Sequence, residues 1–139
     1  MIKLLIFVIS LTLSFSAFAE TTTKILFKVV NVQSIETPEG TYMQVEADIV
    51  TKSSNGLEDE GKCLVNREKG ILSGNCIHTD TDGDIRYSKF YRDTNKGTIG
   101  TSSNLGGTGK WVNNTESCEY NVEIRNLNVG LVYAEMVCP

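Results

Sequence analysis

The residues with the clearest chemical potential are three closely spaced carboxylates, Asp80, Asp82 and Asp84. Acidic residues at alternate positions beside a glycine gather hard oxygen ligands, as calcium-binding loops do. The EF-hand pattern also needs glycine at its sixth position and glutamate at its twelfth, where this chain has Ile85 and Tyr91. The segment therefore predicts an acidic β-turn. Asp80, Asp82 and Asp84 are weak calcium candidates, and no other cofactor is indicated.

His78 is the only histidine of the chain. Acid–base chemistry near neutral pH would have to use this imidazole or a carboxyl group with a shifted pKa. The strand pattern places His78 close to the acidic turn and roughly across from Tyr87. No nucleophile is evident beside it, so we predict a structural histidine and assign no catalytic residue.

A glycine-rich stretch at residues 106–111 is the most distinctive motif. A phosphate-binding P-loop needs G-x-x-x-x-G-K-[ST] followed by a helix, and neither the spacing nor a helical pattern is present here. The glycines instead predict a bend between strands with positive φ or close backbone approach. Trp111 is then expected to plug one end of the core. The motif consists of Gly106, Gly107, Thr108, Gly109, Lys110 and Trp111.

The same motif, GGTGK followed by an aromatic residue, resembles the signature of the allene oxide cyclase and dirigent barrel superfamily. The order of features is also similar to that of small exported bacterial proteins of unknown function. The resemblance covers about residues 60–112 and implies an eight-stranded antiparallel barrel with an apolar cavity. It carries over no activity, and after Trp111 the chain departs from the family pattern. The matching residues before the motif are Cys63, Gly74, Cys76, Asp80, Asp82, Gly83 and Asp84.

The first 19 residues have the pattern of a secretory signal peptide. Lys3 precedes an apolar run at residues 4–15, and small side chains stand at Ala17 and Ala19. The run is shorter than the roughly 20 residues that a membrane-spanning helix needs. We therefore expect cleavage before Glu20, a single domain at residues 20–139, and a periplasmic or secreted protein without a membrane anchor.

Charge excludes two classes of partner. Residues 1–19 hold one lysine and no acid, so the remaining chain has 12 basic and 17 acidic residues, a net charge of −5. Nucleic acids and anionic membrane surfaces require clustered positive charge. Neither is predicted as a partner.

Four cysteines in an exported domain predict two disulfides, with three possible pairings. If Cys118 faces Cys138 on adjacent antiparallel strands, the same register pairs Tyr120 with Met136 and also pairs Val122 with Ala134 and Ile124 with Val132. Every pair on that face is then apolar, and a one-residue slip would destroy the match. We predict Cys118–Cys138 and, by elimination, Cys63–Cys76.

The remaining pattern is that of an all-β protein. Met43, Val45, Ala47 and Ile49 alternate with polar residues, and turn signals recur throughout the chain. About eight strands with few breaks favour a small closed antiparallel barrel, and a β-sandwich is the alternative.

The favoured functional interpretation is an exported, non-enzymatic binding module for an apolar small molecule or an envelope protein. One alternative is an envelope stress or inhibitor-type protein that acts through its surface. A further alternative is a cyclase or isomerase that uses His78, Tyr87 or a buried acid.

Overall fold

The computed structural model describes residues 20–126 and 128–139. The predicted signal peptide, residues 1–19, lies outside this part of the chain. Within the described residues, no helix is long and apolar enough to cross a membrane.

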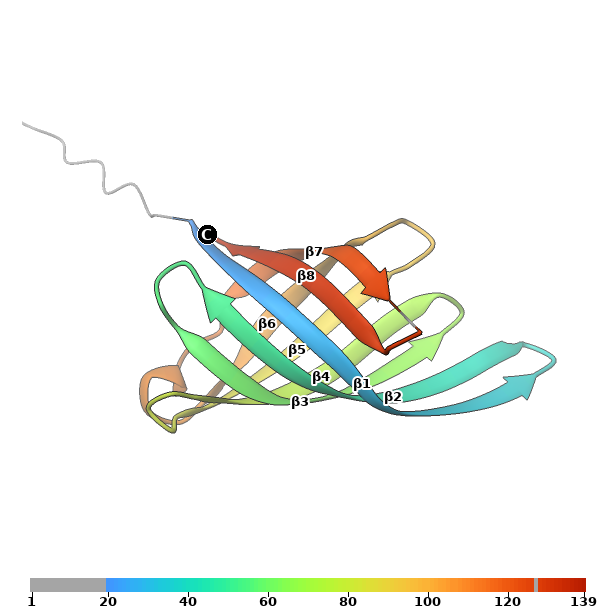
Figure 1. Cartoon of the computed structure of the whole chain (residues 1–139), viewed down its shortest axis with the longest axis horizontal. Helices are drawn as coiled ribbons and strands as arrows, with labels where there is room; N and C mark the ends of the chain where they lie inside the picture. Colours follow the sequence, from blue (N-terminus) through green and yellow to red (C-terminus); the bar gives the residue numbers. More distant parts are fainter. Residues whose placement is uncertain (1–19, 127) are drawn as a thin grey trace, which may run out of the picture.

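Eight antiparallel strands form one closed barrel, in which each strand pairs with its neighbours along the chain and β8 pairs with β1 (Figure 1). The predicted barrel is confirmed, and the sandwich alternative is wrong. The strands are β1 (Thr21–Thr37), β2 (Gly40–Ser53), β3 (Glu58–Glu68), β4 (Ile71–Asp80), β5 (Ile85–Asp93), β6 (Ile99–Gly107), β7 (Ser117–Asn126) and β8 (Leu131–Cys138). A short 3₁₀ turn, η1 (Gly109–Trp111), lies between β6 and β7.

The predicted alternation in β2 is the alternation between the inside and the outside of the barrel. Ala47 and Ile49 are buried, whereas Asp48 and Val50 between and beside them are exposed. Side chains of a strand alternate between its two faces, so a closed barrel buries every second residue. The same rule determines which polar residues enter the interior of the barrel.

Both predicted disulfides are confirmed. Cys63 and Cys76 face each other across β3 and β4 with a Cα–Cα distance of 4.1 Å, and Cys118 and Cys138 join β7 to β8 at 4.5 Å. All four are buried. Structural disulfides persist in oxidising compartments, so the pair indicates an extracytoplasmic protein.

The predicted register of β7 and β8 is correct at one end of the pair and wrong at the other. Tyr120 lies opposite Met136, and Val122 lies opposite Ala134, as expected. A β-bulge after Val122 then shifts the register, so that Arg125 lies opposite Val132, where Ile124 was expected. A bulge adds one residue to one strand and redirects the side chains beyond it. As a result Arg125 faces the interior.

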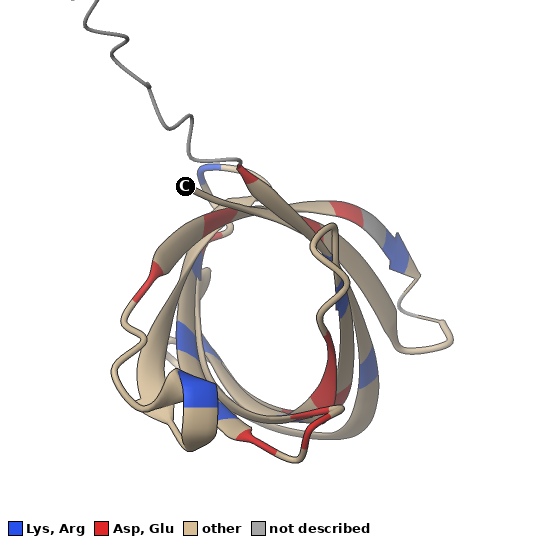
Figure 2. Ribbon diagram, turned by 90° about the vertical axis from the view of Figure 1, so that its left-hand side faces the viewer, with Lys and Arg blue, Asp and Glu red and all other residues tan. Residues whose placement is uncertain are grey.

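The two ends of the barrel differ. The connections at residues 54–57, 81–84 and 108–116 surround one end, which we call the closed end because Trp111 is buried there. At the opposite end, β1 and β2 continue as a hairpin beyond the last β1–β8 pair, Lys28–Leu131. We call this end the arm end. Figure 1 shows the hairpin protruding at the right, and Figure 2 shows the ring of strands from the closed end.

Candidate functional site

A buried carboxylate, Asp59, is the centre of a hydrogen-bonded cluster near the closed end. Its Oδ1 accepts a hydrogen bond from Thr51 Oγ1 at 2.8 Å and lies 3.0 Å from His78 Nδ1. Its Oδ2 forms an ion pair with Arg86 Nη2. The four residues come from four adjacent strands, β2 to β5, and all four are buried. We call these four residues the Asp59 cluster. Its hydrogen bonds connect four of the eight strands.

The ionised carboxylate of Asp59 determines the hydrogen-bond role of His78 Nδ1. Burial alone would raise the pKa of Asp59, but the hydrogen bond from His78 and the charges of Arg86 and His78 outweigh it, and the pKa is lowered. The ionised carboxylate can only accept, so His78 Nδ1 carries a proton. His78 Nε2 lies within hydrogen-bond distance of Ser88 Oγ, at 3.0 Å. Ser88, His78 and Asp59 thus form a continuous hydrogen-bonded chain.

The predicted neighbour of His78 is wrong by one residue. His78 lies opposite Arg86, while Tyr87 lies opposite Ile77. Tyr87 is therefore exposed on the outer face of the barrel, away from the imidazole. A grouping of His78 with Tyr87, as considered for a cyclase or isomerase, does not exist in the structure.

Trp111 closes the end of the barrel beside this cluster, as the sequence predicts. The Arg86 guanidinium lies over its ring, with Cζ 5.1 Å from the ring centroid. Its Nε1 donates to Asp80 Oδ2 at 2.9 Å. The indole therefore joins the Asp59 cluster to the acidic turn between β4 and β5.

The glycines of the motif act as predicted. Gly106 has a φ of 93°, which favours glycine, and a Cβ on Gly107 would lie 1.9 Å from the carbonyl oxygen of Ile85. Thr108 Oγ1 accepts a hydrogen bond from the backbone N–H of Ile85 at 2.8 Å. The motif thus allows β6 to approach β5 closely and leads the chain into the turn that carries Trp111.

The carboxylates of all three calcium candidates have protein partners, and that of Asp84 accepts from the backbone N–H of Lys110 at 3.3 Å. Asp80 Oδ1 accepts from the backbone N–H groups of Asp82 and Asp84, and Lys110 Nζ lies 2.9 Å from Asp80 Oδ2 and 2.7 Å from Asp82 Oδ2. Burial would raise the pKa of Asp80, but the hydrogen bonds from Lys110, Trp111 and the two backbone groups lower it to about 2. A calcium ion bound by Asp80 and Asp82 would have to displace the Lys110 ammonium group.

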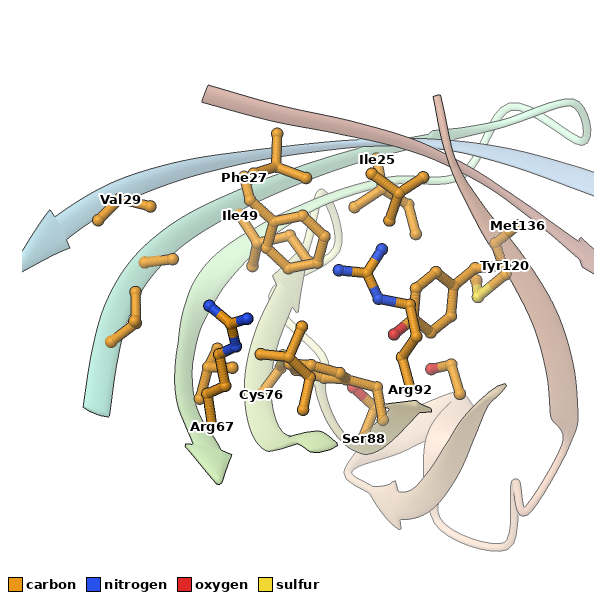
Figure 3. A pocket seen from close by; sticks show the side chains of 18 of the residues that line it. Ile25, Phe27, Val29, Ile49, Arg67, Cys76, Ser88, Arg92, Tyr120 and Met136 are labelled. Carbon is orange, nitrogen blue, oxygen red and sulfur yellow. The ribbon is translucent and has the colours of Figure 1, made fainter. Parts of the chain in front are cut away.

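A cavity of about 400 Å³ occupies the interior. It extends from Ser88 and His78 towards the arm end, where the exposed Arg67 and Arg125 also line it. Figure 3 shows the labelled side chains converging on this space from several strands. Its apolar wall includes Ile25, Phe27, Ile49, Val65, Leu72, Phe90, Val122, Val132 and Met136. The predicted apolar interior therefore has room for a small ligand.

Two buried arginines of β5, Arg86 and Arg92, differ in their partners. Arg86 is paired with Asp59 and also donates to Asn104 Oδ1 at 3.0 Å, and only its Nε has no hydrogen-bond partner among the described residues. Arg92 is 6% exposed, and its Nε and Nη1 have no hydrogen-bond partner among the residues that the structure describes. Burial, together with the charges of Arg125 and Arg67, lowers the pKa of Arg92. Figure 3 shows its guanidinium group extending into the cavity.

Tyr120 of β7 lies beside this group. Burial raises the pKa of its phenol to about 12, despite the opposing charge of Arg92. A Cβ on Gly100 would lie 2.5 Å from the phenolic oxygen, so this glycine makes room for the ring. The phenol therefore stays neutral beside the cation and supplies no counter-charge at neutral pH.

Sequence reasoning missed the arginines. Arg86 and Arg92 have the same parity in β5 as Ser88 and Phe90, and all four line the cavity. The sequence signal that could have identified them is their spacing by an even number of residues from the apolar Phe90, which places them on the same face of the strand. No catalytic residue was assigned from the sequence. The six motif residues form the end of β6 and the turn towards β7 described above.

A search of protein-family models and of curated proteins finds no match to this sequence.

Proposed function

We propose that this protein is an exported, non-enzymatic binding module that holds an apolar small molecule inside its barrel. The observation that supports this most is the interior cavity of about 400 Å³ with a largely apolar wall. Pockets of this size that bury most of a ligand are typical of small-molecule sites. We further propose the periplasm or the extracellular medium as its location, and kinship with the allene oxide cyclase and dirigent barrels on the basis of the GGTGKW motif.

The physical basis of binding would be transfer of the ligand out of water. Each buried methylene group contributes about 0.8 kcal/mol. The wall that receives it is preformed, because it belongs to strands paired on both sides in a closed barrel. Preorganisation lowers the entropic cost of binding.

Filling the cavity, which Val45 and Val132 line, should weaken binding. We expect Val45→Phe and Val132→Phe, which place rings in the cavity, to weaken retention of the neutral lipophilic dye phenylnaphthylamine by at least about 10-fold. Dye fluorescence titration measures this. Val50→Phe is the matched control, since Val50 is 54% exposed on the outer face of β2.

Two results would contradict the binding proposal. One is the absence of dye binding to the wild-type protein. The other is equal dye affinity in Val45→Phe, Val132→Phe and Val50→Phe, because this would place the dye outside the barrel.

A second candidate function, ester hydrolysis, is favoured by the Ser88–His78–Asp59 chain, because Ser88 and His78 line the cavity. Ser88 Oγ would add to an ester carbonyl while His78 Nε2 takes its proton and returns it to the leaving alcohol. Water would then release the acid and restore the serine.

For this candidate, we expect hydrolysis of p-nitrophenyl decanoate to fall by about 100-fold or more in Ser88→Ala. Ser103→Ala, on β6 outside the cavity lining, is the control and should retain the wild-type rate. Equal rates in wild type and Ser88→Ala would reject this function and leave the binding proposal intact.

A further inference from the structure

We propose that the ligand is an amphiphile with one compact anionic head, that Arg92 binds this head, and that the apolar tail lies along the cavity wall. The inference rests on the proposed binding function and names its ligand class. Carboxylates and phosphate monoesters share the required chemistry: oxygen acceptors with negative charge on an apolar chain.

The distribution of positive charge in the molecule is the first argument. All four arginines of the chain, Arg67, Arg86, Arg92 and Arg125, line the cavity, whereas none of the described lysines does. The described residues that line it include no aspartate and no glutamate. The chain as a whole is acidic, with a net charge of −4, so the overall composition does not account for this basic interior.

The choice of arginine is itself informative. The planar guanidinium group presents several N–H donors in a fixed fork that matches carboxylate and phosphate oxygens. The β-bulge after Val122 brings Arg125 to the interior position opposite Val132. Arg67 and Arg125 line the cavity and are exposed to solvent. Arg92 lines the same cavity and is buried.

The contrast between Arg92 and Arg86 is the second argument. Both belong to β5, both are buried, and both face the cavity. Nε of Arg86 also lacks an acceptor, but the Arg86 guanidinium is paired with the carboxylate of Asp59. The described residues offer no acceptor to Nε and Nη1 of Arg92, and none of their carboxylates forms an ion pair with it. A buried charge without a partner is strongly unfavourable. An anionic head beside Arg92 would supply the missing acceptor.

The wall around Arg92 fits the tail of such a ligand. Phe90 contacts Phe27 and Tyr120, with ring centroids 6.3 Å apart in each pair. Figure 3 shows the Arg92 guanidinium among Phe27, Ile25 and Tyr120. A head at Arg92 would therefore leave its chain in contact with aromatic and aliphatic side chains.

Calorimetric titration with three ligands of equal chain length tests the inference: decanoate, decyl phosphate and 1-decanol, each below its micelle-forming concentration at neutral pH. We expect at least one anion to bind wild type about 10- to 100-fold more tightly than decanol. Arg92→Met should remove this preference and leave decanol affinity within about threefold. The anion that is preferred distinguishes a carboxylate from a phosphate ligand.

Lys89→Met is the matched control, because it removes one positive charge from an exposed residue of the same strand. It should keep the anion preference. In the absence of ligand, Arg92→Met should also raise the urea midpoint, since it replaces a buried cation, whose Nε and Nη1 have no acceptor among the described residues, by an apolar chain.

Each contrary result has a distinct meaning. Equal affinity of decanol and both anions for wild type, or an anion preference that survives Arg92→Met, would overturn the anionic-head inference while retaining the binding function. A lower urea midpoint for Arg92→Met would also contradict it, because the guanidinium would then be stabilised by the protein itself. Failure of all three ligands to bind would overturn both proposals.

Discussion

Replacing Asp59 by alanine is expected to lower the free energy of unfolding by about 3–5 kcal/mol. The substitution leaves the buried Arg86 without its carboxylate and removes the acceptor of Thr51 and His78. Removal of one partner from a buried ion pair is costly because the other charge stays buried and uncompensated. Urea denaturation monitored by Trp111 fluorescence measures the loss.

Glu60→Ala is the control for this prediction, since Glu60 is the next residue of β3 and is exposed. It should change stability by less than about 0.5 kcal/mol. Asp59→Ala combined with Arg86→Met should recover part of the loss, because Arg86 then leaves no uncompensated charge at the position of the Asp59 cluster. A loss below about 1 kcal/mol in Asp59→Ala alone would contradict the role given to the Asp59 cluster.

The stabilisation from Asp59 should depend on pH in a defined direction. The folded-state pKa lies below the ordinary value of 3.8. Asp59 therefore stabilises the fold fully above that value, and the contribution is lost as the pH falls through the lower, folded-state pKa. The stability difference between wild type and Asp59→Asn should accordingly shrink in strong acid and stay constant between pH values of about 5 and 7.

Removing the Cys118–Cys138 disulfide is expected to destabilise the barrel by about 3 kcal/mol. The bond closes a loop with a sequence separation of 20 and holds β7 to β8. On its other side β7 pairs with β6 over only five residue pairs, Ile99–Asn121 to Ser103–Ser117. The double substitution Cys118→Ser, Cys138→Ser, measured by urea denaturation, gives the loss directly.

Comparison with Cys63→Ser, Cys76→Ser separates a general effect of cross-linking from a special role of β7. Loop closure alone predicts nearly equal losses, since the sequence separation is 13 for this pair. Removal of both bonds should cost about 6 kcal/mol, which approaches or exceeds the stability of many domains. Unchanged stability after loss of either bond would show that the bond does not stabilise the folded barrel.

Much of the fold was predictable because barrel strands follow a strict two-residue alternation. Ala47 and Ile49 display it in the sequence, and the cysteine pairs fit the same register. The prediction was wrong where a β-bulge interrupts the alternation, as it does between Val122 and Ile124. A bulge leaves no clear mark in a single sequence, since it depends on how the neighbouring strand and the turn pack.

The interior polar residues were less predictable than the strands. A buried arginine and a solvent-exposed arginine look alike in the sequence, and the parity that Arg86 and Arg92 share with Phe90 is the signal that they face inward. Asp59 lies in the acidic segment LEDEGK, where its exposed neighbours Glu58 and Glu60 suggest a solvated strand. The interior position of Asp59 follows from its pairing opposite Thr51 and Asp80, which local composition does not reveal.

The buried polar residues towards the two ends of the barrel differ in their hydrogen-bond partners. At the closed end, Asp59 has three protein partners and Trp111 has a hydrogen bond. Towards the arm end, the buried Arg92 offers donors without acceptors among the described residues. Satisfied polar networks rigidify a fold, whereas an unpaired buried group costs stability and is typical of a functional site.

The most direct test of an interior ligand site is the position of a bound molecule. We would record intermolecular nuclear Overhauser effects between unlabelled phenylnaphthylamine and methyl-labelled protein. Contacts to Ile25, Ile49 and Val132, which line the cavity, are the predicted result. Contacts confined to the exposed Leu64 and Ile77 would place the molecule on the outer face and contradict the account.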